Sequence, residues 1–292
     1  MFSIIVCSIR PDEAERLRQN IESTIGVPFE FIAYDNRGTG KGICQVYNEC
    51  AEKAQHENLC FVHEDIEFLT DNWGEIIAAK LADPECGVIG FAGSAMKSKS
   101  PSGWCSTGRY GTRMNYIQGH ENGEYLCSEN PYNEDFSGVV TLDGLCLFIS
   151  RENWNKLKFD QETLQGFHCY DVDFTIAAHT AGLRNWVCNT VLLKHFSPGS
   201  YDDRWASENH KLHNKWEKHL PLYVKQKSKK FQKKMEWKTN LEWAYQLGLK
   251  GVFKHTDRKY MFQYIALHPL NGRSYRLLSK YLKYKFKKKA DK

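Results

Sequence analysis

The sequence lacks features that would assign it to a membrane or secreted class. Its ten cysteines form no CxxC pair, and residues such as Cys60 and Cys146 lie in apolar, strand-like runs where cysteine acts as a small hydrophobe. No apolar stretch approaches the roughly 20 residues of a transmembrane helix, and no cationic region precedes the apolar run at the N-terminus. We therefore expect reduced thiols in a cytoplasmic protein that is soluble or peripheral to a membrane.

Three nucleotide-binding signatures are also missing. The glycine-rich segment at residues 38–42 (GTGKG) has neither the spacing of a Walker loop nor the full dinucleotide fingerprint. The segment Ser8–Pro11 is poor in glycine, which argues against the basic, glycine-rich signature of a nucleotidyltransferase. A flexible turn near a nucleotide is the most that residues 38–42 indicate.

Charge is distributed unevenly along the 292 residues. Residues 225–292 carry 20 Lys and Arg against four acids, or +16, whereas the rest carries 20 basic and 31 acidic residues, or −11. We predict a helix near the C-terminus. One of its faces is formed by Leu277, Leu278, Tyr281 and Leu282, and basic residues occupy most of the rest. Such a basic amphipathic helix is typical of binding to an anionic membrane, although a solvated charge run is the alternative. No nucleic-acid recognition fold is indicated, so we expect no nucleic-acid partner.

Strand and helix patterns alternate through the first third of the chain. Strands are predicted at residues 3–9, 29–35, 59–65 and 87–93, and helices at 12–24, 43–55 and 72–81. This order predicts an α/β fold, with a mostly parallel sheet flanked by helices on both faces. Later elements are predicted at residues 139–150, 151–157, 171–181 and 185–195.

Two further segments complete the predicted organisation. Residues 94–138 show little periodicity, and we expect an irregular segment that either folds over a substrate or is an ordinary insertion. Beyond Gly199 the pattern is helical and basic. We therefore divide the chain into a catalytic domain at 1–199 and a helical basic extension at 200–292.

Polar side chains recur directly after apolar runs. They are Asp35, Asp65, Asp143, Asp171 and His195. Because ligands gather at the carboxyl ends of strands in open α/β sheets, this recurrence predicts one convergent site. Carboxylate oxygens in such a place suit Mg²⁺ or Mn²⁺, which neutralises a departing diphosphate. A polar strand end followed by a helix cap is the alternative for the segment around Asp65.

Together these motifs resemble the inverting family-two glycosyltransferases with a GT-A, Rossmann-like fold. The resemblance is closest to the bacterial glycosyltransferase-like subset whose metal motif reads His-x-Asp, here His63-Glu64-Asp65. It covers about residues 3–220. The resemblance implies that Asp65, with His63 and the distant His195, binds the metal, although a lone His such as His195 is often structural.

The resemblance also implies roles around the donor nucleotide sugar. Asp35 would accept a hydrogen bond from uracil, or else cap its own Asx turn. Asn48 would contact the nucleotide, or else be satisfied locally on its helix. Asp143 and Gly144 would lie near the donor sugar and acceptor, and Lys215 or Arg204 would meet the diphosphate.

Asp171 has the strongest catalytic claim. The resemblance places a general base in an acid-rich motif that opens a helix, here Tyr170-Asp171-Val172-Asp173. We expect the helix dipole to keep Asp171 ionised, although an Asp at this position also caps a helix. Tyr170 replaces the first acid of the family's motif, so a partner of the site is expected to be missing.

These observations predict a metal-dependent inverting hexosyltransferase. It would move a sugar to a hydroxyl of a glycan or lipid-linked acceptor in surface polysaccharide synthesis at the inner face of the cytoplasmic membrane. The uracil contact at Asp35 favours a UDP-linked donor. A nucleotidyltransferase acting on sugar phosphates is one alternative. A catalytically inactive nucleotide- or glycan-binding scaffold is the other, since His63 and Tyr170 depart from the usual acids.

Overall fold

The first 94 residues alternate between strands and helices, as the sequence predicts. The computed structural model describes residues 1–105, 108–120, 123–197, 199, 202–249 and 258–290. Its first elements are β1 (Phe2–Ser8), α1 (Pro11–Thr24), β2 (Phe29–Asp35), α2 (Ile43–Lys53), β3 (Asn58–Val62), β4 (Ile66–Phe68), α3 (Trp73–Leu81), β5 (Cys86–Gly90) and β6 (Ala92–Ser94).

The middle of the chain is more regular than its sequence suggests. It contains β7 (Met96–Lys97), the 3₁₀ turn η1 (Gly108–Tyr110), β8 (Thr112–His120), β9 (Gly123–Glu129), β10 (Phe136–Val139), β11 (Thr141–Leu142) and β12 (Cys146–Ser150). The prediction of an irregular segment at 94–138 is therefore wrong, because β8 and β9 pair as an antiparallel hairpin. Most of β9 is exposed, so no alternation of apolar residues marks it.

The remaining elements are mainly helical. They are α4 (Arg151–Leu157), α5 (Tyr170–Thr180), β13 (Arg184–Cys188), β14 (Leu193–His195), α6 (Asp203–Trp216), β15 (Leu222–Tyr223), α7 (Lys229–Leu249), α8 (Arg258–Leu267) and α9 (Gly272–Ala290).

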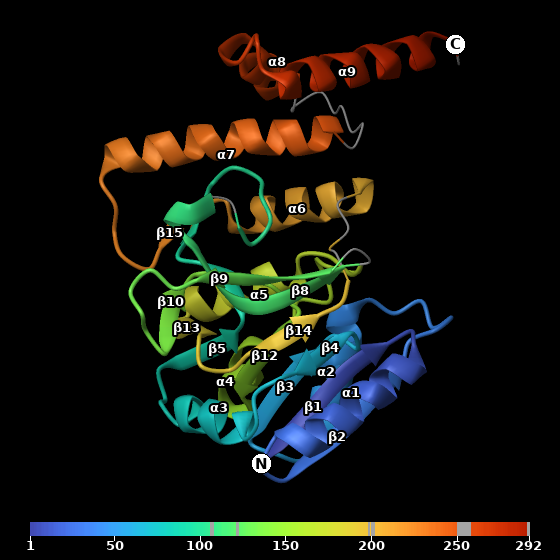
Figure 1. Cartoon of the computed structure of the whole chain (residues 1–292), viewed down its shortest axis with the longest axis vertical. Helices are drawn as coiled ribbons and strands as arrows, with labels where there is room; N and C mark the ends of the chain where they lie inside the picture. Colours follow the sequence, from blue (N-terminus) through green and yellow to red (C-terminus); the bar gives the residue numbers. More distant parts are fainter. Residues whose placement is uncertain (106–107, 121–122, 198, 200–201, 250–257, 291–292) are drawn as a thin grey trace.

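A seven-stranded sheet in the order β10-β13-β5-β12-β3-β1-β2 forms the centre of the molecule (Figure 1). Strands β2, β1, β3, β5 and β13 run in one direction, whereas β12 and β10 run in the other. The predicted mostly parallel sheet flanked by helices is thus confirmed. The antiparallel insertion of β12 between β3 and β5 brings the segment before β12 beside the end of β3, where the His63 amide donates to the Leu145 carbonyl at 3.0 Å.

A second sheet adjoins the first and completes the setting of the site. Its strand order is β11-β6-β8-β14-β4, with β9 paired to β8. The chain passes from β3 in the first sheet to β4 in the second through a short turn at residues 63–65. Strand β14 runs antiparallel to β4 and pairs His195 with Ile66. This register places His195 next to Asp65, 130 positions earlier in the chain.

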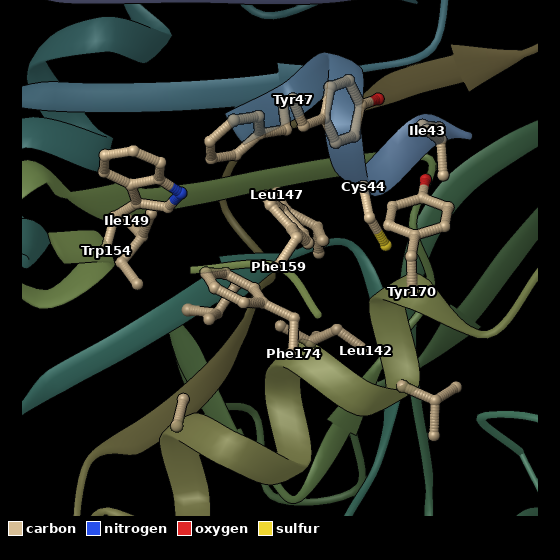
Figure 2. Close-up of a cluster of buried hydrophobic side chains, with 14 of the residues drawn as sticks. Ile43, Cys44, Tyr47, Leu142, Leu147, Ile149, Trp154, Phe159, Tyr170 and Phe174 are labelled. Atoms are coloured by element: carbon tan, nitrogen blue, oxygen red, sulfur yellow. The ribbon is translucent and has the colours of Figure 1, made fainter. Parts of the chain in front are cut away.

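Aromatic clusters fill both faces of the main sheet. On one face, Phe159 stacks on Phe174 of α5 at a ring-centroid distance of 4.2 Å, close to Tyr170 (Figure 2). On the other face, Phe68 stacks on Trp73, also at 4.2 Å. Each fully buried large apolar side chain contributes about 1.5–3 kcal/mol to stability. The packing therefore holds the first turn of α5 rigidly against the sheet.

The three C-terminal helices form a separate layer with its own small core. Helix α7 crosses one end of the molecule, and α8 and α9 lie outside it (Figure 1). Their buried residues include Leu241, Met261 and Leu277. Helix α6, in contrast, contributes Leu212 to the main core. The predicted division at 199/200 stays a prediction.

No helix among the described residues is both long enough and apolar enough to cross a bilayer. All ten cysteines, each within the described part of the chain, are free thiols.

Glu236 on α7 is the main polar link between the helical layer and the body. Its carboxylate accepts hydrogen bonds from the Ser98 hydroxyl at 2.7 Å, the Lys99 amide at 2.9 Å and the Ser100 amide at 3.0 Å. Because such charge-assisted bonds contribute about 1.5–3 kcal/mol each, Glu236 anchors α7.

We predict that Glu236→Ala loosens α7 and the loop at residues 98–100, raising their amide hydrogen exchange at least about 10-fold, which corresponds to about 1.4 kcal/mol. Glu242→Ala is the matched control, because Glu242 lies on the same helix, is exposed and bonds only to Gln246 among the hydrogen bonds described. Equal exchange in the two variants would contradict the anchoring role.

Candidate functional site

A pocket of about 290 Å³ opens at the carboxyl ends of β1, β2 and β3. This edge of the sheet is where ligands bind in open α/β folds. The pocket is lined by Cys7, Ile9, Arg10, Asn36, Lys41, Gly42, Ile43, His63, Glu64, Asp65, Gln165, Gly166, Phe167 and Ser197.

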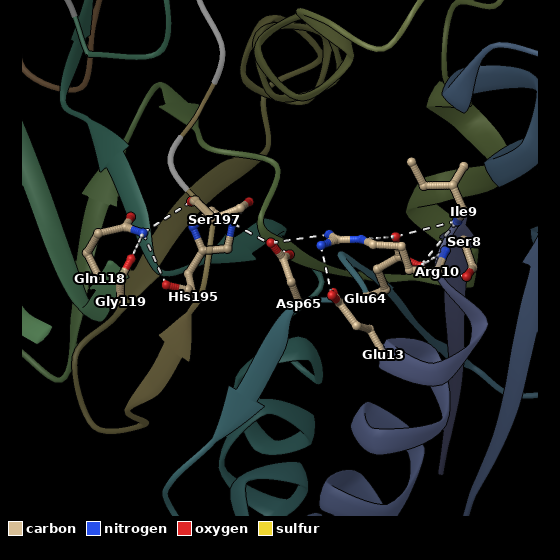
Figure 3. Close-up of polar contacts among 10 residues, drawn as sticks. All are labelled: Ser8, Ile9, Arg10, Glu13, Glu64, Asp65, Gln118, Gly119, His195 and Ser197. Carbon is tan, nitrogen blue, oxygen red and sulfur yellow. Dashed lines mark hydrogen bonds and ion pairs between the residues drawn. The ribbon is translucent and has the colours of Figure 1, made fainter. Parts of the chain in front are cut away.

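His63 and Asp65, two of the predicted metal ligands, line this pocket, and the third, His195, lies beside them without lining it. His63, Asp65 and His195 each offer a ligand atom, and these atoms all lie within 4.8 Å of one another. The Nε2 atom of His195 is 3.6 Å from Oδ1 of Asp65. Figure 3 shows Asp65 between His195 and Ser197 on one side and Arg10 on the other. The sequence-predicted triad is therefore assembled in space.

The chemistry of this triad fits a divalent cation. Oδ2 of Asp65 is buried and accepts no hydrogen bond, and its nearest cationic partner, Nη2 of Arg10, is 3.8 Å away. Burial acts to raise the pKa of Asp65, but His195, Ser197, His63 and Arg10 together lower it below its ordinary value. Burial and the neighbouring His195 lower the pKa of His63, which favours the neutral imidazole that a metal needs.

Glu64, between the two predicted ligands, faces the other way. It accepts hydrogen bonds from the Ser8 hydroxyl at 2.6 Å, the Arg10 amide at 2.9 Å and the Arg10 guanidinium at 3.2 Å (Figure 3). The carboxylate therefore holds the loop that follows β1 and places Arg10 at the pocket.

Asp171 lies in the first turn of α5, with one carboxylate oxygen accepting the Gly144 amide at 2.9 Å. Burial, together with the charge of Asp143, raises the pKa of Asp171 to about 7. The expectation that the helix dipole keeps this group ionised is wrong, because burial and a like charge outweigh the dipole.

Gly144 and Tyr170 connect the metal triad to Asp171. The Tyr170 hydroxyl donates to the Gly144 carbonyl at 2.9 Å and lies 2.8 Å from Nε2 of His63. A Cβ atom on Gly144 would lie 2.2 Å from that hydroxyl, so only glycine fits here. We expected the site to lack a partner because Tyr170 replaces an acid. This expectation is wrong, since the Tyr170 hydroxyl contacts the predicted metal ligand His63 directly.

Asp35 lies at the edge of the pocket without lining it. It is exposed and forms an ion pair with Arg37 at 2.6 Å, and this hydrogen-bonded pair lowers the pKa of Asp35 to about 2. Its neighbour Asn36 does line the pocket. The proposed uracil contact stays a prediction.

Asn48 and Lys215 are engaged within the protein. The Asn48 amide both donates to and accepts from the backbone of Phe159, at 2.9 and 3.0 Å. Lys215 bridges Asp160 and Asp173, at 2.7 and 2.8 Å. These contacts tie α2 and α6 to the segment that leads into α5, and the proposed nucleotide contacts of both residues stay predictions.

Sequence reasoning missed most of the residues that line the pocket, among them Arg10, Lys41 and Phe167. Arg10 could have been found, because it directly follows a strand whose carboxyl end faces the site. Phe167 is 56% exposed, and its ring centroid lies 5.7 Å from that of His63. It belongs to an irregular segment, where no periodic pattern indicates direction.

Comparison with solved structures shows the fold. A crystal structure of S. aureus TarS 1-349 aligns with a TM-score of 0.54 at 14% identity, covering 90% of this chain and 78% of that one. The same protein in complex with UDP gives 0.53 at 12% identity, covering 100% and 92%. A structure of GalNAc-T7 with UDP, GalNAc and Mn²⁺ gives 0.46 at 11% identity, and the chain spans 56% of that protein's length while 95% of this chain is covered. The predicted GT-A fold is thereby confirmed.

Sequence comparisons assign the family. No curated protein sequence gives a significant match. The model of a family described as glycosyltransferase-like matches residues 3–234, which is most of the chain. This protein therefore belongs to the glycosyltransferase-like family and is an enzyme of the glycosyltransferase class.

Proposed function

We propose that this protein is a metal-dependent inverting glycosyltransferase that moves a sugar from a UDP-sugar to a hydroxyl of a glycan or lipid-linked acceptor in surface polysaccharide synthesis. The observation that carries the proposal is the triad of His63, Asp65 and His195 beside a pocket, connected to Asp171 through Tyr170 and Gly144. TarS, which has the same fold, binds UDP, and this supports a uridine donor.

The metal would be held by the triad. Two imidazole nitrogens beside one carboxylate favour Mn²⁺ over Mg²⁺, because Mg²⁺ prefers an all-oxygen environment. When bound, the ion supplies charge that neutralises the diphosphate leaving group. Arg10 and Lys41, which line the same pocket, add positive charge for the phosphates.

Asp171 would act as the general base. A carboxylate with a pKa near 7 is a far stronger base than an ordinary Asp, yet much of it is ionised at neutral pH. One of its oxygens is held by the Gly144 amide, and the other would take the proton of the acceptor hydroxyl. A single displacement at the anomeric carbon needs one such base and inverts the configuration.

Neither alternative has a specific observation in its favour. The family assignment is to glycosyltransferases and not to nucleotidyltransferases. An inactive scaffold would retain the pocket but show no turnover dependent on Asp171, so turnover decides between scaffold and enzyme.

The first test separates the metal site from the base. We predict that Asp65→Ala abolishes Mn²⁺-dependent UDP binding in calorimetry, because two imidazoles alone do not replace the carboxylate. Asp171→Asn should bind UDP normally while transfer from a panel of UDP-sugars falls at least about 100-fold. Normal transfer by Asp171→Asn would move the base elsewhere, and unchanged binding by Asp65→Ala would remove the metal site.

The raised pKa of Asp171 also predicts a pH-dependent stability. The native state retains a proton that the unfolded chain releases near pH 4, so this group's contribution to stability is present at low pH and is lost as pH rises toward 7. Asp171→Asn should therefore melt at a higher temperature than the parent at pH 8, with the difference vanishing near pH 4.

Asp160→Asn is the matched control for this melting experiment. Burial acts to raise the pKa of Asp160, but hydrogen bonds from Lys215 and Thr163 lower it to about 2. This substitution should lower the melting temperature at pH 8. A lower melting temperature for Asp171→Asn at pH 8 would contradict the assignment.

We further propose that α9 binds an anionic membrane, as its composition predicts. Tyr275, Leu278, Leu282 and Phe286 are 59%, 36%, 43% and 68% exposed, and we call these four residues the outer face. Exposed Arg276, Lys280, Lys283 and Lys285 lie among them. The predicted single face is corrected here, because Leu277 is buried and Tyr281 packs inward against the small core. The side chains of residues 287–289 lie outside the described part.

We predict that Leu282→Glu reduces binding to vesicles containing phosphatidylserine at least about 10-fold. The change removes the burial of a leucine, about 1.5 kcal/mol, and adds repulsion of about 1 kcal/mol. Leu270→Glu makes the same change at an 87% exposed position before α9, and should bind normally. Sedimentation with the vesicles measures binding by both variants. An equal loss of vesicle binding in the two variants would show that α9 is a solvated charge run.

A further inference from the structure

The Tyr170 hydroxyl is enclosed between a predicted metal ligand and the backbone beside the predicted base. It lies 2.8 Å from Nε2 of His63 and 2.9 Å from the Gly144 carbonyl. The adjacent Gly144 amide donates to Asp171. Gly144 therefore contacts Tyr170 through its carbonyl and Asp171 through its amide.

The donors and acceptors in this network determine the imidazole tautomer. A carbonyl oxygen only accepts, so the single Tyr170 hydrogen goes to Gly144. The Tyr170 oxygen must then accept from Nε2–H of His63. In the neutral ring, Nδ1 is left with the lone pair, which is the nitrogen able to bind a cation.

The surroundings keep Tyr170 in this place. Its side chain is 4% exposed and lies among aromatic rings, with Phe159 at a centroid distance of 6.1 Å. The absent Cβ of Gly144 leaves the space that the hydroxyl occupies. The hydroxyl is thus built into the fold and cannot be reoriented without moving α5.

We propose that Tyr170 is a positioning residue for the metal site, holding His63 as the Nε2–H tautomer so that Nδ1 is the metal-binding nitrogen. The proposal rests on the metal site of the proposed function. Tyr170 replaces the usual acid of the family's motif, and positioning His63 gives this tyrosine a defined role. A hydrogen bond to the second ring nitrogen orients the ligand and raises its basicity.

Metal affinity provides the main test. Tyr170→Phe removes only the hydroxyl, and we expect it to raise the dissociation constant for Mn²⁺ alone about 10–100-fold in calorimetry. Tyr264→Phe, at a buried tyrosine of α8, should leave the constant unchanged. In a His63→Ala background, Tyr170→Phe should have no further effect, since the hydroxyl acts through His63.

The outcomes distinguish this inference from the proposed function. If Asp65→Ala leaves Mn²⁺ binding unchanged, the metal site itself fails. If Asp65→Ala abolishes binding but Tyr170→Phe binds as tightly as the parent or more tightly, only the role of Tyr170 is overturned.

A second measurement needs no variant and covers the case in which Tyr170→Phe does not fold. Imidazole ¹⁵N chemical shifts of the metal-free parent report the tautomer of His63 directly, with the His63→Ala spectrum giving the assignment. We expect the Nε2–H form, and a dominant Nδ1–H form would overturn the proposal.

Discussion

The site depends on the turn at residues 63–65, where the chain leaves one sheet and enters the other. Strand β3 belongs to the main sheet and β4 to the second, so His63 and Asp65 lie at the junction of the two. Pairing of β14 with β4 then delivers His195 to the same place. Residues distant in sequence are held together by backbone register, which a shift of one residue would disrupt by reversing every side chain.

Asp65 at this junction and Asp171 in the first turn of α5 differ in their electrostatic surroundings. Asp65 has Arg10 and His195 nearby, and its pKa falls despite burial. None of the described ion pairs includes Asp171. Burial and the charge of Asp143 raise the pKa of Asp171 to about 7. One group is thereby suited to hold a cation and the other to accept a proton. Divergent environments for neighbouring acids are how one site separates such roles.

The sequence predicted those parts of the molecule that leave a local signal. Periodicity located β2 and α4 with the bounds that the structure has, and the apolar run before His63 located the metal triad. The β8–β9 hairpin left no such signal, because most of β9 is exposed and both strands are rich in polar residues. The sequence did not show that β12 runs antiparallel to its neighbours, since a strand buried on both faces has the same apolar pattern in either direction.

Side-chain partners were the hardest to predict. Lys215 was expected at a diphosphate because it follows the metal histidine in sequence, yet tertiary contacts pair it with Asp160 and Asp173. Tyr170 looked like a lost acid, although a hydroxyl can replace a carboxylate as a hydrogen-bond acceptor for an imidazole. In both cases the decisive information is which groups the fold brings within 3 Å, and no residue type carries that information alone.

Basic and acidic residues are concentrated in different parts of the molecule. Helices α7, α8 and α9, which carry most of the described basic residues beyond position 225, lie at one end of the long axis, and strands β1 and β2 lie toward the other (Figure 1). Near an anionic surface, the −11 body is repelled while the +16 segment is attracted, so the two effects turn the molecule in the same sense. Each basic group close to such a surface contributes about 1 kcal/mol, within a screening length of about 8 Å. Because α8 and α9 lie beyond α7 and the pocket lies at the carboxyl ends of β1, β2 and β3, the basic helices and the pocket belong to different parts of the molecule (Figure 1).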